Sequence, residues 1–446
     1  MKQVNLLTDS PRRLFFHYLG PTIGSSMVTS IYILADTIMV GQGVGDAGLA
    51  ALTIFMPIVA SFFALGLLLG VGGGVLMSVA KGSGNESLAH KYFSTAMISA
   101  AVVSVCFAVF GAIFFDPMMY ALGADTTNIE LVRGYGLCYT VSAPLFIFSS
   151  SLQSFIRNDK SPRHAMIAVL TGSGLNILLD YLFIFVFKMG MFGASFATSI
   201  GTSITVCILV IHFFTKKNTM RFSFRFFSIK ALWEIAKCGF SGFLIGCANA
   251  VLVFVFNHTL LKYIGSVGVT VYSIMSNVAV VCMSLFNGVT LAAQPIIATN
   301  HGADNHKRVL QVRHIGTITS SVIAVIIFCI GFFFPDLLIY SYVKGPTPEI
   351  LELARYALRI YFFAYLFMNF NIFFSGYFQS TLRPVAAITI QILRSLLLSS
   401  VLVSVLPMIF GADAIWYAVP ITECITFFVA MAFLFFGRFQ KTKEVK

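Results

Sequence analysis

Long apolar stretches recur through almost the whole of this 446-residue chain. A helix that spans the hydrocarbon core of a bilayer needs about 20 apolar residues. Twelve stretches meet that length, at residues 14–41, 48–80, 92–115, 129–156, 165–187, 191–214, 233–262, 268–300, 310–334, 348–379, 384–407 and 411–436. Hydrophobic residues make up 58% of the chain and charged residues only 10%, whereas a soluble domain has about 45–50% and about 25%. The sequence therefore excludes a water-soluble globule and predicts an all-α integral membrane protein with twelve transmembrane helices.

The distribution of Lys and Arg predicts how the chain is oriented in the membrane. Segments on one side of the predicted spans carry 22 of the 29 Lys and Arg residues, segments on the other side carry six, and Arg394 lies inside a span. Loops rich in Lys and Arg face the cytoplasm. We therefore expect a multi-pass protein of the cell membrane with both termini in the cytoplasm. This asymmetry also explains the net charge of +12, so no nucleic-acid partner is expected.

The sequence carries no sign of an enzyme or of a bound cofactor. It contains no Walker A loop, no HExxH motif and no GxSxG motif, which are signatures of ATP binding, zinc proteolysis and serine hydrolysis. The eight Cys residues are scattered through apolar stretches without a CxxC pair. They are expected to be small core residues, with neither disulfides nor a metal site.

An internal repeat divides the chain into two similar halves. A shift of 220 residues places residues 111–120 on residues 331–340 with Gly, Phe, Asp and Tyr in register, and places Gly82 on Gly302. Each half holds six spans, so both halves start on the same side of the membrane and the repeat is parallel. We predict two six-helix bundles related by a pseudo-two-fold axis along the membrane normal, with boundaries at 1–215 for the first bundle, 216–232 for a cytoplasmic linker and 233–446 for the second bundle.

Two acidic residues lie inside spans of the first half. A charge at this depth costs about 2.5–3.5 kcal/mol on insertion scales, and Asp36 and Asp180 both stand there. Asn176 is one helical turn from Asp180 on the same helix face, and Thr198 is expected at a similar depth in the next span. Carboxylate, amide and hydroxyl oxygens suit Na⁺, while two nearby desolvated carboxylates could instead take up protons. The alternative is that both Asp side chains are wetted from the outer surface and that Thr198 bonds only its own helix.

Two opposite charges stand near the middle of spans in the second half. Arg394 and Glu423 are expected at similar depth, and a lone charge there would cost far more than a pair. We expect them to form a buried ion pair. Such a pair would serve either as a static link between helices or in coupling and substrate binding.

Several motifs together resemble the multidrug and toxic compound extrusion (MATE) transporters, most closely the prokaryotic branch with the DinF and MepA types. The motifs are Asp36-Thr-Ile-Met-Val-Gly41 after Pro21, Gly48-Leu-Ala-Ala51 with Pro57, Arg157-Asn-Asp-Lys-Ser-Pro162, Asn176-Ile-Leu-Leu-Asp180, Gly193-Ala-Ser-Phe-Ala-Thr198, Gln294-Pro295 with Gly302-Ala-Asp304, and Arg394 with Pro420-Ile-Thr-Glu423. The resemblance covers nearly the whole chain.

This resemblance implies an antiporter that works by alternating access. The implied activity is export of bulky, often cationic and aromatic organic compounds in exchange for Na⁺ or H⁺. By the same resemblance, Asp36, Asn176, Asp180 and Thr198 match the family's cation site. The expected partners are an organic substrate, a coupling ion and membrane lipid, and a monomer is expected.

The second half departs from another branch of the family. Spans seven and ten lack the carboxylates that this branch uses there, and carry Asn257, Asn369 and Asn371 instead. Coupling through a second site is therefore not expected. The alternatives are a lipid-linked oligosaccharide flippase of the same superfamily, which would need a strongly cationic cleft, and a membrane-embedded enzyme or receptor. A channel is disfavoured because the sequence shows no continuous polar stripe.

Overall fold

The computed structural model describes residues 4–343 and 345–436, with only the backbone described for residues 247–250. Every regular element within these residues is a helix. The first half holds α1 (Pro11–Gly43), α2 (Asp46–Gly82), α3 (Glu86–Ile113), α4 (Phe115–Ala121), α5 (Ile129–Val141), α6 (Ala143–Asn158), α7 (Pro162–Asp180), η1 (Tyr181–Val186), α8 (Gly190–Ile211), η2 (His212–Phe214) and η3 (Phe224–Phe226). The second half holds α9 (Ile229–Tyr263), α10 (Ser266–Gly302), α11 (His306–Phe333), α12 (Pro335–Tyr342), α13 (Pro348–Ser380), α14 (Pro384–Ile392), η4 (Leu393–Leu397), α15 (Leu398–Phe410), η5 (Ala412–Tyr417) and α16 (Ala418–Phe436).

The helices are long and apolar enough to cross a membrane many times. Among the described residues, eleven continuous helical runs qualify by length and hydropathy, and the bent pair α5–α6 gives a twelfth when it is counted as one span. A bilayer offers no water to backbone N–H and C=O groups, so a spanning segment that satisfies them internally is helical. The predicted all-α fold with twelve spans is confirmed.

One predicted span is broken. The sequence predicts a continuous helix over 129–156, but α5 and α6 meet at Ser142 with a bend of 52°. Pro144 lies in the first turn of α6, where its missing N–H leaves no hydrogen bond unmade, while its ring would clash with a helix continuing from α5. A proline two residues after the break therefore explains the bend.

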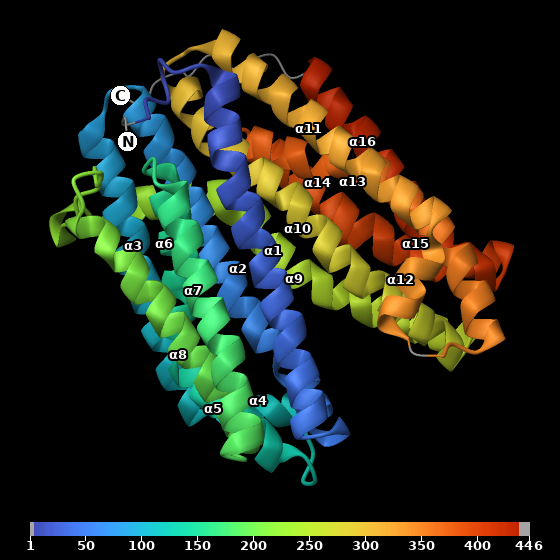
Figure 1. The fold of residues 1–446 in the computed structure, drawn as a ribbon. Coiled ribbons are helices and arrows are strands. Elements are labelled where there is room, and N and C mark those ends of the chain that lie inside the picture. Colours follow the sequence, from blue (N-terminus) through green and yellow to red (C-terminus); the bar gives the residue numbers. More distant parts are fainter. Residues whose placement is uncertain (1–3, 344, 437–446) are drawn as a thin grey trace. The chain divides into compact units, whose positions relative to one another are not determined.

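The described contacts divide the chain into two compact units. The first unit comprises Met1–Cys247 and Leu291–Arg313, and the second comprises Ala248–Thr290 and His314–Lys446. In the first unit α1, α2, α7 and α8 run lengthwise beside one another (Figure 1). The start of α9, up to Cys247, and the end of α10, from Leu291, belong to this unit as well. The boundaries predicted from the repeat, at 216 and 232, stay a prediction.

Glycines hold these parts of α9 and α10 against α2. A Cβ atom added at Gly82 would lie 2.0 Å from the carbonyl oxygen of Thr299, and one added at Gly302 would lie 2.0 Å from that of Val79. The sequence repeat pairs Gly82 with Gly302, so the two helices cross with local two-fold symmetry. A Cβ at Gly239 on α9 would likewise lie 2.0 Å from a carbonyl oxygen of α2. Small residues allow such backbone contact between membrane helices.

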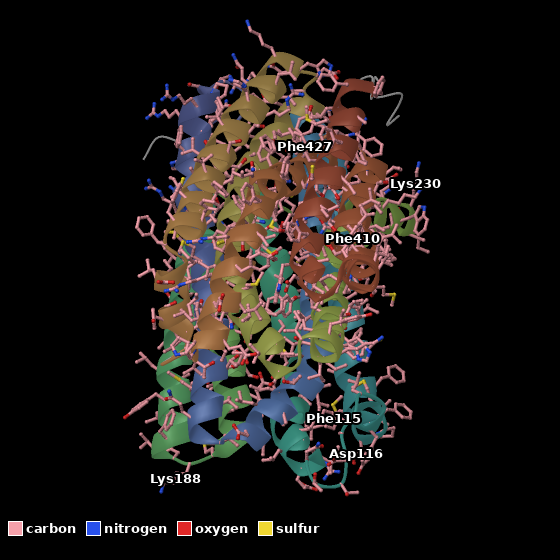
Figure 2. All side chains as sticks on the ribbon, turned by 90° about the vertical axis from the view of Figure 1, so that its right-hand side faces the viewer. Phe115, Asp116, Lys188, Lys230, Phe410 and Phe427 are labelled. Atoms are coloured by element: carbon pink, nitrogen blue, oxygen red, sulfur yellow. The ribbon has the colours of Figure 1, made fainter. Side chains whose placement is uncertain are left out.

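The repeat also appears in two short helices that were not expected. α4 in the first unit and α12 in the second each follow a long span, and each carries an Asp that accepts two hydrogen bonds from an Arg on the next helix. Arg133 bonds Asp116 at 3.2 and 2.5 Å, and Arg355 bonds Asp336 at 2.6 and 2.7 Å. The hydrogen bonds from Arg355 hold the pKa of Asp336 below its ordinary value. In the first unit, Asp116 lies at the end that also carries Lys188, while Lys230 lies toward the other end (Figure 2).

We expect Gly302→Ala to destabilise the folded protein, because its Cβ would overlap a backbone carbonyl that no rotamer change can move. Overpacking of this kind costs about 1–3 kcal/mol. Thermal unfolding of the purified protein in detergent would show a lower midpoint. Gly20→Ala is the matched control, since a Cβ there has no atom within 4 Å and Ala is a better helix former than Gly. Equal midpoints for the two variants would contradict the close crossing of α2 and α10.

Candidate functional site

Asp180 is the last residue of α7 and is completely buried. Its exposed fraction is 0%, and neither of its carboxylate oxygens has a hydrogen-bond partner. The π-helix η1 begins at the next residue. π-helical segments are rare, and they occur frequently at functional sites. The alternative considered from the sequence, in which Asp180 is wetted from the outer surface, does not describe this buried side chain.

Asn176 and Thr198 face each other across α7 and α8. The Asn176 amide Nδ2 donates to the Thr198 Oγ1 at 3.3 Å, and that hydroxyl donates to the Ala194 carbonyl of its own helix at 3.0 Å. Both side chains are buried, and the amide oxygen of Asn176 has no partner. Thr198 therefore bonds its own helix and also joins the polar group around Asp180.

Close packing of α7 on α8 keeps this polar group together. A Cβ added at Gly172 would lie 1.8 Å from the Thr205 hydroxyl, and one added at Gly201 would lie 2.8 Å from the Cβ of Asn176. The two helices therefore pack in close contact beside Asn176 and one turn before it, where Gly172 faces Gly201. This contact leaves the amide little freedom to turn away from Thr198.

Asp36 on α1 approaches the same pocket. Its side chain is partly exposed, but its Oδ1 atom is buried and has no hydrogen-bond partner. Helix α1 packs along α7, which places the Asp36 carboxylate within electrostatic range of Asp180. None of the ion pairs between described residues involves either one. The structure thus brings Asp36, Asn176, Asp180 and Thr198 together from three helices.

Three tyrosines lie within electrostatic range of these carboxylates and were missed by the sequence analysis. Tyr32 on α1 and Tyr135 on α5 feel the charges of both carboxylates, and Tyr139 feels that of Asp36. The rings of Tyr135 and Tyr139 stack with centroids 5.7 Å apart. Spacing could have indicated them, because Tyr32 is one turn before Asp36 and the other two are one turn apart.

The pocket presents four buried oxygen atoms without partners. They are Asp36 Oδ1, Asn176 Oδ1, Asp180 Oδ1 and Asp180 Oδ2. A buried carboxylate without a partner is costly unless a cation or a proton neutralises it. The described residues contain no group of three or more His, Cys, Asp and Glu side chains placed to hold a metal ion. Carboxylate, amide and hydroxyl oxygens are donors that suit a hard cation such as Na⁺, and two carboxylates near each other can instead take up protons.

The charges in the second unit are arranged differently, because they neutralise each other. Arg394, inside the π-helix η4, donates to Glu423 Oε1 from Nη2 at 2.8 Å and from Nε at 3.2 Å. Both residues are buried. Asn371 on α13 donates to the Glu423 Oε2 at 2.7 Å and to its carbonyl oxygen at 2.8 Å. Both oxygens of this carboxylate are thus satisfied, and Asn371 is a partner that the sequence analysis did not assign.

The MatE family matches residues 21–182 and 238–405. The chain is similar to the multidrug export protein MepA of Staphylococcus haemolyticus, with 25% identity over 434 residues that cover 97% of this chain and 95% of that protein.

Solved structures share the fold. An outward-facing multidrug resistance MATE family transporter of the MOP superfamily superposes with a TM-score of 0.91 at 21% identity, and covers 97% of each chain. A MOP superfamily transporter from Pyrococcus furiosus, for which a reversed polarity of the binding pocket suggests a different function, gives a TM-score of 0.91 at 22% identity over 99% of each chain.

The buried pair of the second unit makes a testable prediction about stability. Arg394→Met should lower the free energy of unfolding by about 3–5 kcal/mol, because it leaves Glu423 buried without its counter-charge. The double variant Arg394→Met/Glu423→Leu should recover most of that loss. Thermal unfolding of the purified variants measures both effects. A double variant as unstable as the single one would contradict the interpretation that the two charges serve mainly to neutralise each other.

Proposed function

The chain belongs to the MatE family of multidrug efflux transporters, and we propose that it is a secondary active antiporter that exports bulky organic compounds in exchange for Na⁺ or H⁺. It is a multi-pass membrane protein. We infer that its basic end, which carries the linker, faces the cytoplasm. The carboxylate pocket then lies nearer the outer surface, where an external ion can reach it.

The observation that carries the proposal is the pair of unpartnered carboxylates on α1 and α7. An ion that binds between Asp36 and Asp180 removes a large electrostatic penalty, so it stabilises whichever arrangement of α1 and α7 brings them together. Organic substrate needs only to stabilise a different arrangement for exchange to follow. A coupling free energy of about 1–3 kcal/mol between the two ligands is typical.

The proposed substrates are bulky and often cationic. The multidrug export function stated for MepA supports the broad class. Anionic residues and tyrosine rings around the pocket favour a positively charged aromatic compound, since a cation is attracted to both. The flippase alternative would need a cationic site for pyrophosphate, whereas the charged residues of this pocket are both acidic.

Efflux from vesicles with imposed gradients tests the coupling. An inward gradient of Na⁺ and an inward gradient of H⁺ are applied separately to vesicles that contain the purified protein and a fluorescent organic cation. Transport driven by at least one gradient is expected. Transport that needs neither gradient would rule out antiport.

We expect Asp180→Asn to abolish ion-driven efflux while the protein stays folded in the membrane. The change keeps the size of the side chain and removes the charge that a coupling ion neutralises. A coupling free energy of about 1–3 kcal/mol means that the bound ion changes the substrate affinity by about 5-fold to 150-fold. The variant should lose this factor. Asp46→Asn is the matched control, because Asp46 is exposed on α2. This variant should transport normally.

A binding measurement separates coupling from misfolding. If Na⁺ is the ion, a concentration of about 100 times its Kd should stabilise the native protein by about 2.7 kcal/mol, and this shift in the thermal midpoint should vanish in Asp180→Asn. If H⁺ is the ion, the thermal midpoint of the native protein should depend on pH, and this dependence should be weaker in Asp180→Asn. Normal efflux by Asp180→Asn would count against the scheme.

A further inference from the structure

Residues 215–228 join η2 to α9; this segment corresponds to the linker predicted at 216–232, and the name linker refers to residues 215–228 from this point on. The linker is strongly basic: it contains Lys216, Lys217, Arg221 and Arg225, and Lys230 follows it. No Asp or Glu occurs between Tyr181 and Trp233. All five basic side chains are exposed. None of them forms an ion pair within the described parts of the chain. This surface therefore has uncompensated positive charge.

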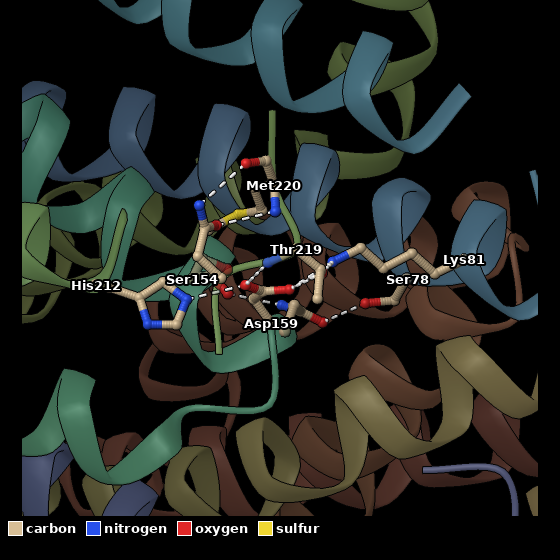
Figure 3. A network of polar contacts seen from close by, with 9 residues as sticks. Ser78, Lys81, Ser154, Asp159, His212, Thr219 and Met220 are labelled. Carbon is tan, nitrogen blue, oxygen red and sulfur yellow. Dashed lines mark hydrogen bonds and ion pairs between the residues drawn. The ribbon is translucent and has the colours of Figure 1, made fainter. Parts of the chain in front are cut away.

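A buried carboxylate fixes the start of the linker to the bundle (Figure 3). Asp159, in the loop between α6 and α7, accepts the backbone N–H of Thr219 at 3.0 Å and the Thr219 hydroxyl. Lys81 lies 2.5 Å from its Oδ1, and His212 lies 2.9 Å from its Oδ2. Burial alone would raise the pKa of Asp159, but the hydrogen bonds from His212, Lys81 and Thr219 and the charge of Lys81 hold it below its ordinary value. The carboxylate is therefore charged at neutral pH and binds the linker firmly.

Two hydroxyl groups on α3 fix the rest of the linker. Ser94 and Thr95 each accept one backbone N–H of the linker and donate to one of its carbonyl groups. The four bonds are Ser223 N to Ser94 Oγ at 3.2 Å, Ser94 Oγ to Arg221 O at 3.4 Å, Ser228 N to Thr95 Oγ1 at 3.3 Å, and Thr95 Oγ1 to Phe226 O at 3.3 Å. The linker is thus held to the bundle at both its start and its end, through backbone groups of residues 219, 221, 223, 226 and 228.

Large apolar side chains stand out from this fixed backbone. Phe224 is 76% exposed, and the ring of Phe222 packs against it edge-on with centroids 5.1 Å apart. Trp233, in the first turns of α9, is 63% exposed, and the ammonium of Lys237 lies 5.1 Å from its ring. Met220, by contrast, is buried against the bundle. The same short region therefore presents exposed aromatic rings among exposed cations.

This combination matches the boundary between lipid headgroups and acyl chains. Trp and other aromatic side chains favour that depth, and segments with basic and aromatic residues lie in the plane of the interface, bound more strongly where the lipid is anionic. The linker joins two membrane-spanning helices, so its distance from the bilayer surface is short. Its charge is complementary to a phosphate headgroup that carries no compensating cation.

We propose that the linker binds anionic phospholipid, with lipid phosphate at Arg221 and Arg225 and with Phe222, Phe224 and Trp233 inserted beside it. The attachment to Asp159, Ser94 and Thr95 presents this surface in one orientation. The binding is independent of the antiport proposed above, since none of these residues belongs to the carboxylate pocket.

Fluorescence of Trp233 provides the test. The chain has two Trp residues, and Trp416 is 1% exposed within the second unit, so Trp416→Phe leaves Trp233 as the sole emitter. The protein is reconstituted in vesicles of phosphatidylcholine and phosphatidylglycerol, in equal amounts. Brominated acyl chains, which quench tryptophan on contact, are placed on one lipid or on the other. We expect quenching by brominated phosphatidylglycerol to exceed quenching by brominated phosphatidylcholine by about twofold or more.

Charge removal identifies the binding residues. Arg221→Gln/Arg225→Gln should abolish the excess, and added salt should reduce it in the unchanged linker. Lys188→Gln/Lys262→Gln removes two exposed cations outside the linker and should leave the excess unchanged. If Trp416→Phe does not fold, the difference between the wild-type protein and Trp233→Phe gives the same signal. Equal quenching by the two lipids, or an excess that survives Arg221→Gln/Arg225→Gln, would overturn the proposal.

Discussion

The cost of a bare charge in hydrocarbon governs where this protein places its ionisable groups. In the second unit the cost is met internally, because Arg394 and Glu423 neutralise each other and Asn371 completes the carboxylate's hydrogen bonds. In the first unit it is left unmet at Asp36 and Asp180, whose buried oxygens have no partners. The two units are both bundles of long helices, but they treat their buried charges differently. In the exchange proposed above, this difference is the reason why the coupling ion would bind in the first unit and not in the second.

The features that depend on composition, namely the spans and the buried charged positions, could be predicted from the sequence. The features that depend on contacts between helices could not. The spans followed from apolar length, and the charged positions at Asp36, Asp180, Arg394 and Glu423 stood out because charge is rare in such segments. The break at Ser142 was readable in principle from Pro144. The π-helices after Asp180 and around Arg394 carry no sequence signature that hydropathy detects. Hydropathy also gives no sign of the role of Asn371, which arises only where α13 meets α16. For the tyrosines, helical spacing was the one available signal.

The repeat shows how two halves can keep one arrangement while their sequences drift. Asp116 and Asp336 stay in register, yet the Arg that bonds each of them is not at the same offset, because Arg355 lies two positions later than a shift of 220 from Arg133 would place it. Each Arg nevertheless reaches both oxygens of its Asp. What persists is the link between a short helix and the helix after it. A comparison by residue identity alone underestimates this similarity.

The mutual neutrality of Arg394 and Glu423 has a consequence in an energised membrane. A potential of 100 mV does about 2.3 kcal/mol of work on one elementary charge that crosses the bilayer, but almost none on a compact dipole whose two ends move together. The membrane potential therefore does little work on the Arg394–Glu423 pair. It acts instead wherever net charge changes, and in the proposed cycle that is the space between Asp36 and Asp180 when an ion enters or leaves.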